Sequence, residues 1–598
     1  MDKKVRIGCA SAFYGDSQLS ARQLVDKGNI DYLVFDYLAE VTMAILARSK
    51  AKNENLGYAL DFVTVAMQDV LADCAKKGIK VIANAGGVNV PGCIKALQEL
   101  CKKQQLSLNI AGVYGDDIST SIHQFADNND LTESQTGQAL PQKLASANAY
   151  LGAKPIADAL AAGADIVVTG RVVDSAVVIG PLMHEFNWQN GDYDLLAQAA
   201  LAGHIIECGA QCTGGNFTDW HLVPDFSNMS YPIVEVNADG TFVVEIPPET
   251  GGLVNEGTIA EQIVYEIGDP ANYLLPDVCC DFSQVKLSQI GENKVRVENA
   301  KGRAPSNEYK VCATYLDGYK LTSSFFMGGL RCADKARANL NAWVKRTQQV
   351  FLEKGWSDYR DVSIEIIGTE DTYGKHAKQQ HTREVMGKYG LHHDNKDALK
   401  FASMELAYLA TSGAPGMSGF GFGRLQPSPL MRIHSTLINK KLINITVQLN
   451  DEVIINKSYE SKKKSLLSPK SEYGAEVSGE QFIAADDLIE VPLERLAYGR
   501  SGDKGDNANV GVIAREQAYL PALYQQLTAE SVADYFSHCV AGEVERFFLP
   551  GFNAFNFLMT EALGGGGTAS LRVDTQAKAY AQMLLSKQIT ISKALLVE

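Results

Sequence analysis

The segment Pro155-Ile-Ala-Asp-Ala-Leu-Ala-Ala-Gly-Ala-Asp-Ile-Val-Val-Thr-Gly-Arg171 contains a complete passage from a helix to a strand. Pro155 suits the first turn of a helix, and Gly163 suits the left-handed position that ends one. The apolar run Asp165–Thr169 follows at once and indicates a buried strand. This passage therefore predicts one βαβ unit of a parallel sheet.

The same alternation of helix and strand runs from residue 5 to about residue 220. We expect strands at Val5–Ala10, Tyr32–Phe35, Lys80–Asn84, Asn109–Val113 and Asp165–Thr169. A further amphipathic stretch, Leu195–Cys208, is long enough to cover one face of a sheet. Residues 1–225 are therefore predicted to form an α/β fold, with a wound, mainly parallel sheet and helices on both faces.

The pattern changes beyond residue 226. Tyr231–Val236 and Thr241–Ile246 flank Asn237-Ala-Asp-Gly240, which predicts an antiparallel hairpin. Lys310–Leu316 and Lys320–Phe326 are two further strand-like runs, and Ala333–Glu353 is predicted to be a helix. Residues 226–456 are therefore expected to be an α+β region that completes a core of residues 1–456.

The C-terminal part begins after a polar stretch. Residues 457–484 are rich in Ser, Lys, Glu and Gly, which predicts a linker. Residues 485–598 follow in the order β-β-α-β-x-β-α, with Ala569–Val573 expected as one of the strands. That order suits a small α/β sandwich.

Composition limits the partners of the chain. With 598 residues, a formal net charge of −15 and 46% hydrophobic residues, the chain is globular and acidic. An acidic surface repels a phosphate backbone, so no nucleic acid is expected. The N-terminal residues lack the apolar run of a signal peptide, and no stretch approaches the roughly 20 apolar residues that cross a bilayer, so we expect a cytoplasmic protein with no membrane contact. Its eleven cysteines, an odd number, are expected to be free thiols. Metabolic enzymes are often homo-oligomers, and we expect one here.

Polar side chains follow several of the predicted parallel strands. Ligands bind beyond the carboxyl ends of such strands, so these residues are candidates for one shared site. They are Asp16, Asp36, Glu40, Asn84, Gly86, Gly87, Asp116, Asp117, Arg171 and Asp174. Other interpretations stay open, since Asp16 and Asp174 could cap helices and Gly86-Gly87 could serve only a tight turn. Arg171 could form a structural ion pair with Asp174 or hold a carboxylate or phosphate of a ligand.

One helical stripe adds a further candidate. It consists of His204, Glu207, Cys208, Gln211 and Cys212, at i, i+3, i+4, i+7 and i+8. His and Cys at successive turns are not a recognised set of metal ligands, so we predict no metal site and expect the thiols to pack in the core. Glu207 could be a partly buried general base.

The glycine-rich stretch Tyr498-Gly-Arg-Ser-Gly-Asp-Lys-Gly-Asp-Asn-Ala-Asn-Val-Gly-Val-Ile513 combines flexible backbone with charges of both signs. Its candidate substrate-binding residues are Arg500, Gly502, Asp503, Lys504, Asp506 and Asn507. A backbone nest that holds a phosphate or carboxylate is one interpretation. A divalent-ion site and a folded turn at a domain interface are the others. A second pliable loop, Gly564-Gly-Gly-Gly567, follows later in the chain.

Several stretches together resemble the AtuA family, named for acyclic terpene utilisation and formerly a domain of unknown function. They are Ala12–Asp16, Asp31–Glu40, Gly163–Arg171, Gly203–Gly215 and Tyr498–Ile513. The likeness extends over nearly the whole chain. It implies a ferredoxin-like C-terminal domain. It also implies a role in the breakdown of acyclic terpenes or branched acids, beside enzymes that act on acyl-CoA, so coenzyme A is expected only as part of a substrate.

Two functions are compatible with these residues. The sequence has no GxGxxG after the first strand and no GxxxxGK[ST], GxSxG or HExxH motif, which disfavours nicotinamide enzymes, P-loop ATPases and serine hydrolases on the usual template. The first hypothesis is a hydratase or lyase that moves protons on a small acyl-CoA substrate. Its candidate catalytic residues are Asp16, Glu40, Arg171, Asp174 and Glu207. The alternative is a non-catalytic protein of the same pathway that binds an acyl group or anion or serves in assembly.

Overall fold

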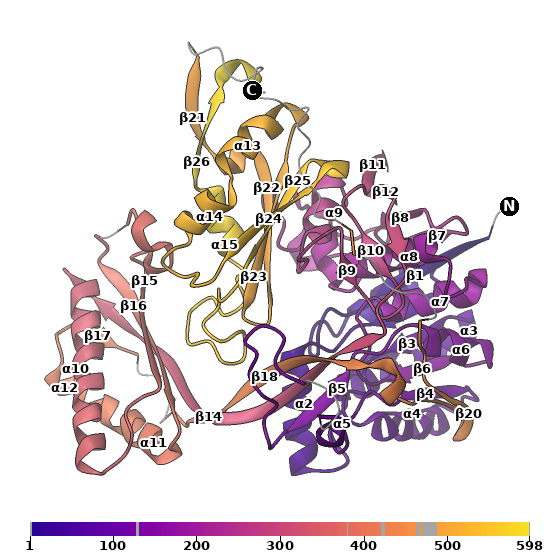
Figure 1. Cartoon of the computed structure of the whole chain (residues 1–598), viewed down its shortest axis with the longest axis horizontal. Coiled ribbons are helices and arrows are strands. Elements are labelled where there is room, and N and C mark those ends of the chain that lie inside the picture. Colours follow the sequence, from indigo (N-terminus) through magenta and orange to yellow (C-terminus); the bar gives the residue numbers. More distant parts are fainter. Residues whose placement is uncertain are drawn as a thin grey trace.

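A computed structural model describes residues 3–126, 131–379, 381–419, 425–461, 467–468 and 487–596 (Figure 1). Most of the predicted linker 457–484, namely residues 462–466 and 469–484, lies outside these ranges. Within them, no helix is long and apolar enough to span a lipid bilayer.

A sheet of eleven strands forms the centre of the N-terminal part. Its middle consists of five parallel strands, in the spatial order β1, β2, β3, β6, β4. These strands are Lys4–Cys9, Tyr32–Phe35, Lys80–Ala83, Ile166–Thr169 and Ile110–Tyr114, respectively. The register places Leu33 opposite Val81, and Val81 opposite Ile166. The parallel core that the sequence predicts is thus confirmed, and the carboxyl ends of all five strands share one edge of the sheet.

Antiparallel strands extend this parallel core on both sides. On the side of β1 they are β7 (Ile233–Asn237), β8 (Phe242–Glu245), β12 (Lys294–Glu298) and β11 (Lys286–Gly291). On the side of β4 they are β19 (Ile445–Leu449) and β20 (Glu452–Lys457). The predicted hairpin is confirmed as β7 and β8. The strands of residues 233–245, 286–298 and 445–457 therefore belong to the same sheet as the five parallel strands.

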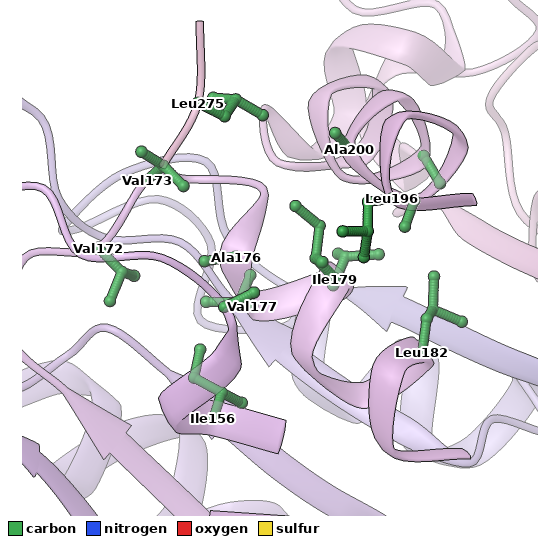
Figure 2. Packing of buried hydrophobic residues seen from close by; sticks show 14 of the residues in the cluster. Ile156, Val172, Val173, Ala176, Val177, Ile179, Leu182, Leu196, Ala200 and Leu275 are labelled. Atoms are coloured by element: carbon green, nitrogen blue, oxygen red, sulfur yellow. The ribbon is translucent and has the colours of Figure 1, made fainter. Parts of the chain in front are cut away.

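Helices cover both faces of the sheet, as predicted. One face buries α1 (Ser20–Lys27), α2 (Glu40–Lys52), the π-helix η1 (Phe62–Met67), α3 (Gln68–Lys77) and α4 (Val90–Gln104). The other buries α6 (Lys154–Ala161), α7 (Ala176–Phe186) and α8 (Tyr193–Ile206). Figure 2 shows Ile179 of α7 beside Leu196 of α8, and both side chains are fully buried. Pro155 lies in the first turn of α6 and Gly163 has a φ of +95°, as the opening segment predicts.

One strand connects the N-terminal part to the middle region. β14 (Glu308–Gly328) is 21 residues long and replaces the two strands predicted at Lys310–Leu316 and Lys320–Phe326. A register shift between Leu316 and Tyr319 lets it continue without a turn. Its first half pairs with β5 (Ser146–Ala149) and β18 (Ser428–Asn439). Its second half pairs with β16 (Glu384–His393), which also pairs with β15 (Asp361–Ile367). The helices α10 (Cys332–Glu353) and α11 (Lys396–Glu405) pack against this second half.

The C-terminal domain contains a four-stranded antiparallel sheet in the order β22, β23, β25, β24. These strands are Ala497–Lys504, Asn507–Ala514, Ala554–Met559 and Val544–Leu549. The helices α13 (Leu520–Gln526), α14 (Ala529–Tyr535) and α15 (Tyr580–Leu585) share their core with it. The strand predicted at Ala569–Val573 is wrong, since these residues form turns, and β21 (Leu488–Pro492) pairs instead with β26 (Gln588–Ser592). We call the sheet of β15, β16 and the second half of β14 the middle sheet. In Figure 1 the C-terminal domain, coloured orange to yellow, lies between the N-terminal part and the middle sheet.

Candidate functional site

Asp36 and Asn84 lie side by side at the shared edge, because β2 and β3 end next to each other. The Asn84 amide donates a hydrogen bond to the Asp36 carboxylate and accepts one of 2.7 Å from the backbone N–H of Tyr37. Asn84 is fully buried, so the predicted substrate-binding residue serves to position Asp36. Burial raises the pKa of Asp36 well above its ordinary value, and the charges of Asp174 and Glu207 raise it further.

Arg171 follows β6 and is fixed from several sides. Its backbone N–H donates to Asp116 over 2.8 Å, and its Nη1 donates to the carbonyl of Val172 over 2.8 Å and to Asp174. The guanidinium carbon lies 3.9 Å from the centre of the Tyr150 ring. Burial opposes the charge of Arg171, but Asp174 and other nearby acidic groups outweigh it and raise its pKa. Arg171 is thus a fixed cation at the edge of the sheet.

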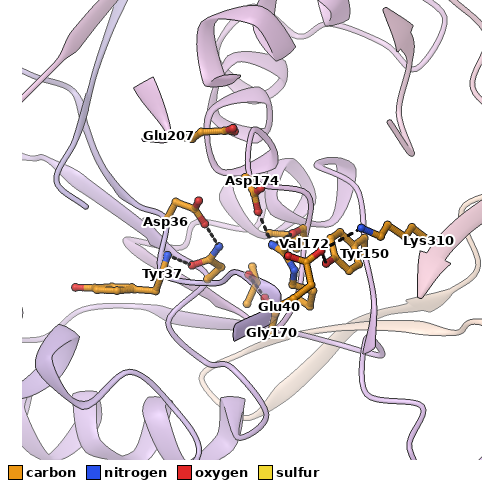
Figure 3. Close-up of polar contacts among 12 residues, drawn as sticks. Asp36, Tyr37, Glu40, Tyr150, Gly170, Val172, Asp174, Glu207 and Lys310 are labelled. Atoms are coloured by element: carbon orange, nitrogen blue, oxygen red, sulfur yellow. Dashed lines mark hydrogen bonds and ion pairs between the residues drawn. The ribbon is translucent and has the colours of Figure 1, made fainter. Parts of the chain in front are cut away.

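Glu40 is the first residue of α2, and its carboxylate contacts one hydroxyl group and one ammonium group. The Tyr150 hydroxyl donates to its Oε1 over 2.8 Å, and Nζ of Lys310 lies 3.1 Å from the same atom (Figure 3). Burial opposes ionisation of Glu40, but Lys310, Arg171, Lys504 and the Tyr150 hydroxyl together lower its pKa. Glu40 is therefore a permanent anion that holds the surrounding cations in place.

Glu207 directly follows α8 and is buried next to His204. Burial raises the pKa of Glu207 well above its ordinary value, and the charges of Asp174 and Glu266 add to this effect. Oε1 of Glu207 lies 3.3 Å from Nδ1 of His204, whose Nε2 faces the carbonyl of Ile263 at 3.3 Å. Burial lowers the pKa of His204 to about 4, so the ring is neutral at neutral pH.

Asp36, Asp174 and Glu207 face a common region from three different segments of the N-terminal part (Figure 3). We name these three residues the acid cluster. The charge of Asp174 raises the pKa of both Asp36 and Glu207, and the charge of Glu207 raises the pKa of Asp36 as well. The proximity of these carboxyls therefore favours the protonated forms of Asp36 and Glu207.

Lys504 brings a cation from the C-terminal domain to the acid cluster. It lies at the tip of the hairpin formed by β22 and β23, and it is solvent-exposed. The surrounding protein partly desolvates its ammonium group, but four carboxylates outweigh this effect and raise its pKa. They belong to Glu266, Glu40, Asp174 and Glu207. The hairpin tip and the sheet edge therefore form one electrostatic unit.

Asp503, next to Lys504, titrates near neutral pH. Burial and the charge of Glu266 raise its pKa to about 7, whereas Lys578 opposes the shift. Its carboxylate has one weak contact, at 3.5 Å, with the Gln576 amide. A carboxyl with a pKa near 7 is well matched to proton transfer at neutral pH.

The rest of the glycine-rich stretch makes contacts inside the protein. Residues 497–504 and 507–514 are the paired strands β22 and β23, so this stretch is a hairpin with a short turn at its tip. A Cβ on Gly502 would come within 2.4 Å of Tyr265, so the close packing of Tyr265 requires a glycine at this position. Arg500 donates to the carbonyl of Asn216 over 2.9 Å and lies over the Tyr265 ring. Asp506 accepts from three backbone N–H groups of the second glycine-rich loop, those of Leu563, Gly565 and Gly566. Asn507 is buried, and its Oδ1 has no hydrogen-bond partner.

Asp16 and Asp174 do not cap helices. Asp16 accepts hydrogen bonds from the Ala12 N–H at 2.9 Å and the Tyr231 hydroxyl at 3.1 Å, and so closes the loop after β1. The residues at the starts of α1 and α7 are Leu19 and Ser175, and neither helix has a side-chain cap. The capping interpretation is therefore wrong for both aspartates.

Gly86 and Gly87 form a packed turn after β3. A Cβ on Gly86 would lie 2.5 Å from the carbonyl oxygen of Thr169, and Gly87 has a φ of +53°. Both residues are buried. The structure therefore places them beneath the site, where they bring β3 and β6 close together.

Three residues that position or polarise the site were not predicted from the sequence. Tyr150 and Lys310 contact Glu40, and Glu266 influences Asp503, Lys504 and Glu207. Tyr150 follows β5, a short strand whose residues Ser-Ala-Asn-Ala lack the apolar alternation of a strand. Within the described ranges, no group of three or more His, Cys, Asp or Glu side chains could hold a metal ion.

The chain was compared with known protein families. The family described as acyclic terpene utilisation family protein AtuA matches residues 5–449, and the AtuA ferredoxin-like domain matches residues 491–590. The chain belongs to the AtuA family. No curated protein and no solved structure matches it. Membership in the AtuA family implies a role in acyclic terpene utilisation, and the two matched regions bring the acid cluster and Lys504 together.

Proposed function

We propose that this chain is an enzyme of acyclic terpene or branched-chain acid breakdown that moves protons on a small acyl substrate, with an acyl-CoA as the best candidate. One observation carries the proposal. Two buried carboxyls with raised pKa values, Asp36 and Glu207, lie near Glu40, whose pKa is lowered, and near the cations Arg171 and Lys504. Neighbouring acids with pKa values pushed apart are typical of acid–base catalysis.

The environments of the individual residues assign their roles. Glu40 has a lowered pKa, so it is a poor base and acts by holding Lys310 and Arg171. Glu207 is the proton donor, because burial raises its pKa and so favours its protonated form. Asp503 has a pKa of about 7 and is the base. Lys504 and Arg171 stabilise negative charge that develops on the thioester carbonyl oxygen.

The proposed reaction is addition of water to an α,β-unsaturated acyl group or its reversal. Asp503 takes a proton from water while the water oxygen bonds to the β carbon. Glu207 gives its proton to the α carbon, and the cations stabilise the enolate oxygen between these steps. The product contains one additional water, and proton exchange between the two carboxyls restores their starting states. Carbon–carbon lyase chemistry would use the same enolate.

The test is isotope incorporation from D2O. Purified protein is incubated in D2O with a panel of saturated and unsaturated branched acyl-CoAs, and the mass of each is followed. We expect deuterium at the α carbon or a mass gain of one D2O for at least one member of the panel. Saturable thermal stabilisation by the panel without turnover or exchange would instead identify a non-catalytic binding protein.

The Glu207→Gln variant tests the proposed donor. The amide is nearly isosteric and cannot donate a proton in the same way, so turnover should fall by about 10²–10⁴-fold. The melting temperature should change little, because glutamine has nearly the shape of the protonated carboxyl that burial favours at this position. Glu353→Gln, at an exposed position at the end of α10, is the matched control. Unchanged turnover in Glu207→Gln would remove Glu207 from the mechanism.

A further inference from the structure

A cavity of about 420 Å³ lies between the middle sheet and the C-terminal domain. It is separate from the acid cluster, since neither Asp36, Asp174, Glu207 nor Lys504 lines it. One wall is the end of β15 with the turn after it, and the other is residues 572–583 with His538 and Cys539. Small-molecule sites commonly have volumes of about 300–1,000 Å³ and lie between domains.

The apolar part of the lining comes from both walls. Ile367 of the middle sheet and Val573 of the C-terminal domain both line the cavity, and each is 42% exposed. Ile367 pairs across the sheet with Met386, which pairs with Phe326, and these two side chains are 37% and 38% exposed. A row of three exposed apolar side chains thus leads from the cavity along the sheet. Such a row suits an apolar chain.

The carboxylates that line the cavity are already engaged. Glu365 lies 2.6 Å from Nζ of Lys388, and Asp371 lies 2.8 Å from Nη2 of Arg337. Asp574 accepts hydrogen bonds from the backbone N–H groups of its own turn. Glu370, likewise, accepts from two backbone N–H groups. These acids are therefore satisfied without a ligand.

Arg572, in contrast, has side-chain N–H groups that donate to no other described residue. Its Nη1 donates to the carbonyls of Cys539 and Ala562, at 2.6 and 2.5 Å, which anchors the guanidinium. Among the described residues, its Nε and Nη2 have no hydrogen-bond partner. These two nitrogens share one edge of the guanidinium and match the two oxygens of a carboxylate.

We propose that this cavity binds an amphiphilic carboxylate, with the carboxylate on the free edge of Arg572 and the apolar chain between Ile367 and Val573. This second site does not depend on the proposed catalytic function. A bound acid would contact both the middle sheet and the C-terminal domain. It would also touch the segment between Ala562 and Arg572, whose start is hydrogen-bonded to Asp506 at the hairpin tip. Occupancy would therefore stabilise the position of the hairpin.

Calorimetric titration of the full chain with octanoate, below its micellar concentration, tests the site. We expect saturable binding of one octanoate per chain, and at least tenfold weaker binding of octan-1-ol, which lacks the carboxylate. Ile367→Glu and Val573→Glu should each weaken octanoate binding at least tenfold, because they place a like charge in the cavity. Both positions are partly exposed, so the variants should fold.

Three further variants make the result specific. Leu352→Glu, at a position that is 81% exposed on α10, is the matched control and should bind octanoate normally. Arg572→Lys keeps the charge but loses the two-pronged edge, so it should weaken binding. Lys504→Ala should bind octanoate as the wild type does. Absence of saturable binding, or binding lost in Lys504→Ala and kept in Val573→Glu, would overturn the proposal.

Discussion

Lys504 is the single residue on which the proposed site most depends, because it comes from a different domain than the acids around it. Its ammonium group lowers the pKa of Glu40 and opposes the raised pKa of Glu207. At the same time it is solvent-exposed at the tip of the hairpin. Its effects on activity and on stability should therefore be separable.

The Lys504→Ala variant should lose activity without unfolding. Removing one cation that stabilises a developing oxyanion typically costs about 10²–10³-fold in turnover. An exposed substitution of this kind should change the free energy of unfolding by less than about 1 kcal/mol. Turnover of the active acyl substrate and thermal denaturation check both numbers. A collapse of the melting temperature would mean that the hairpin tip is structural.

The stability of the folded chain should depend on pH through Glu261, which lies near the contact between the two domains. Burial raises its pKa from 4.5 to about 7, and its Oε1 accepts from the Thr218 N–H over 3.0 Å. The folded chain therefore holds this proton where the unfolded chain has released it, so the contribution of Glu261 to stability falls as the pH rises from 4.5 to 7.

Glu261→Gln keeps the hydrogen-bond acceptor and removes the titration. The variant should be more stable than the wild type at pH 8, by on the order of 3 kcal/mol, and equal to it at pH 4. Urea denaturation at several pH values measures the difference. A stability difference that does not depend on pH would show that Glu261 does not titrate in this range.

At the level of single residues, the sequence predicted which side chains meet but not their roles. Arg171, Asp174 and Asp36 could be placed because parallel strands end at one edge of the sheet. The contacts of Lys310 and Tyr150 with Glu40 could not, since they depend on how β14 and β5 cross above that edge. No local pattern encodes such a crossing.

Among the secondary-structure elements, the hairpin of β22 and β23 differs most from its predicted form. An anion-binding nest, a divalent-ion site and a folded turn at a domain interface were all open for this stretch, and Gly499, Gly502 and Gly511 pack closely against neighbouring side chains. A Cβ on Gly511 would lie 2.1 Å from Val264, and one on Gly502 would lie 2.4 Å from Tyr265. A glycine in the sequence shows that the backbone can adopt a wide range of φ at that position. It does not show which neighbouring side chain packs against it.

Gly511→Ala should therefore weaken the contact between the hairpin and the N-terminal part. The added methyl group must displace Val264, which is fully buried, at a cost of about 1–3 kcal/mol. Gly191→Ala is the matched control, because a Cβ there meets no atom within 4 Å. Chemical denaturation of both variants gives the comparison. Equal stability of the two would show that the contact adapts without cost.

Helices and strands with a clear periodic pattern of apolar residues were predicted well. Elements whose conformation depends on tertiary packing were not. The five parallel strands and α10 lie within a few residues of their expected positions. α7 was missed because Ala-Val-Val-Ile-Gly-Pro-Leu-Met is apolar on all sides and contains Pro181, so it shows no amphipathic pattern. It is a helix because it is buried between α6 and α8.

For the whole molecule, Asn509 is one of the buried polar contacts between the two matched regions, beside the ion pair of Arg515 with Asp219. Its Oδ1 accepts from the Glu266 N–H at 2.9 Å, and its Nδ2 donates to the Val264 carbonyl at 2.6 Å and to Asn556. Asn509→Ala leaves buried groups unpaired, which costs about 1–3 kcal/mol for each. We expect the C-terminal domain to melt separately and to be released by limited proteolysis.

Asn53→Ala serves as the control for Asn509→Ala. Asn53 is exposed, and its side chain accepts two local hydrogen bonds, from the backbone N–H and the side-chain amide of Asn55. Its replacement should leave a single melting transition. If Asn509→Ala also melted in one transition at the wild-type temperature, the remaining contacts between the domains, such as the Arg515–Asp219 ion pair, would be sufficient to hold them together.

The long path of the chain through the eleven-stranded sheet affects its synthesis on the ribosome. β4 is complete after residue 114, yet its outer neighbour β19 begins only at residue 445. At about 5–20 residues per second, the edge of β4 stays unpaired for roughly 15 seconds or longer after it emerges. A nascent chain of this protein thus exposes an open strand during most of translation, which makes it a natural client for chaperones that shield β edges.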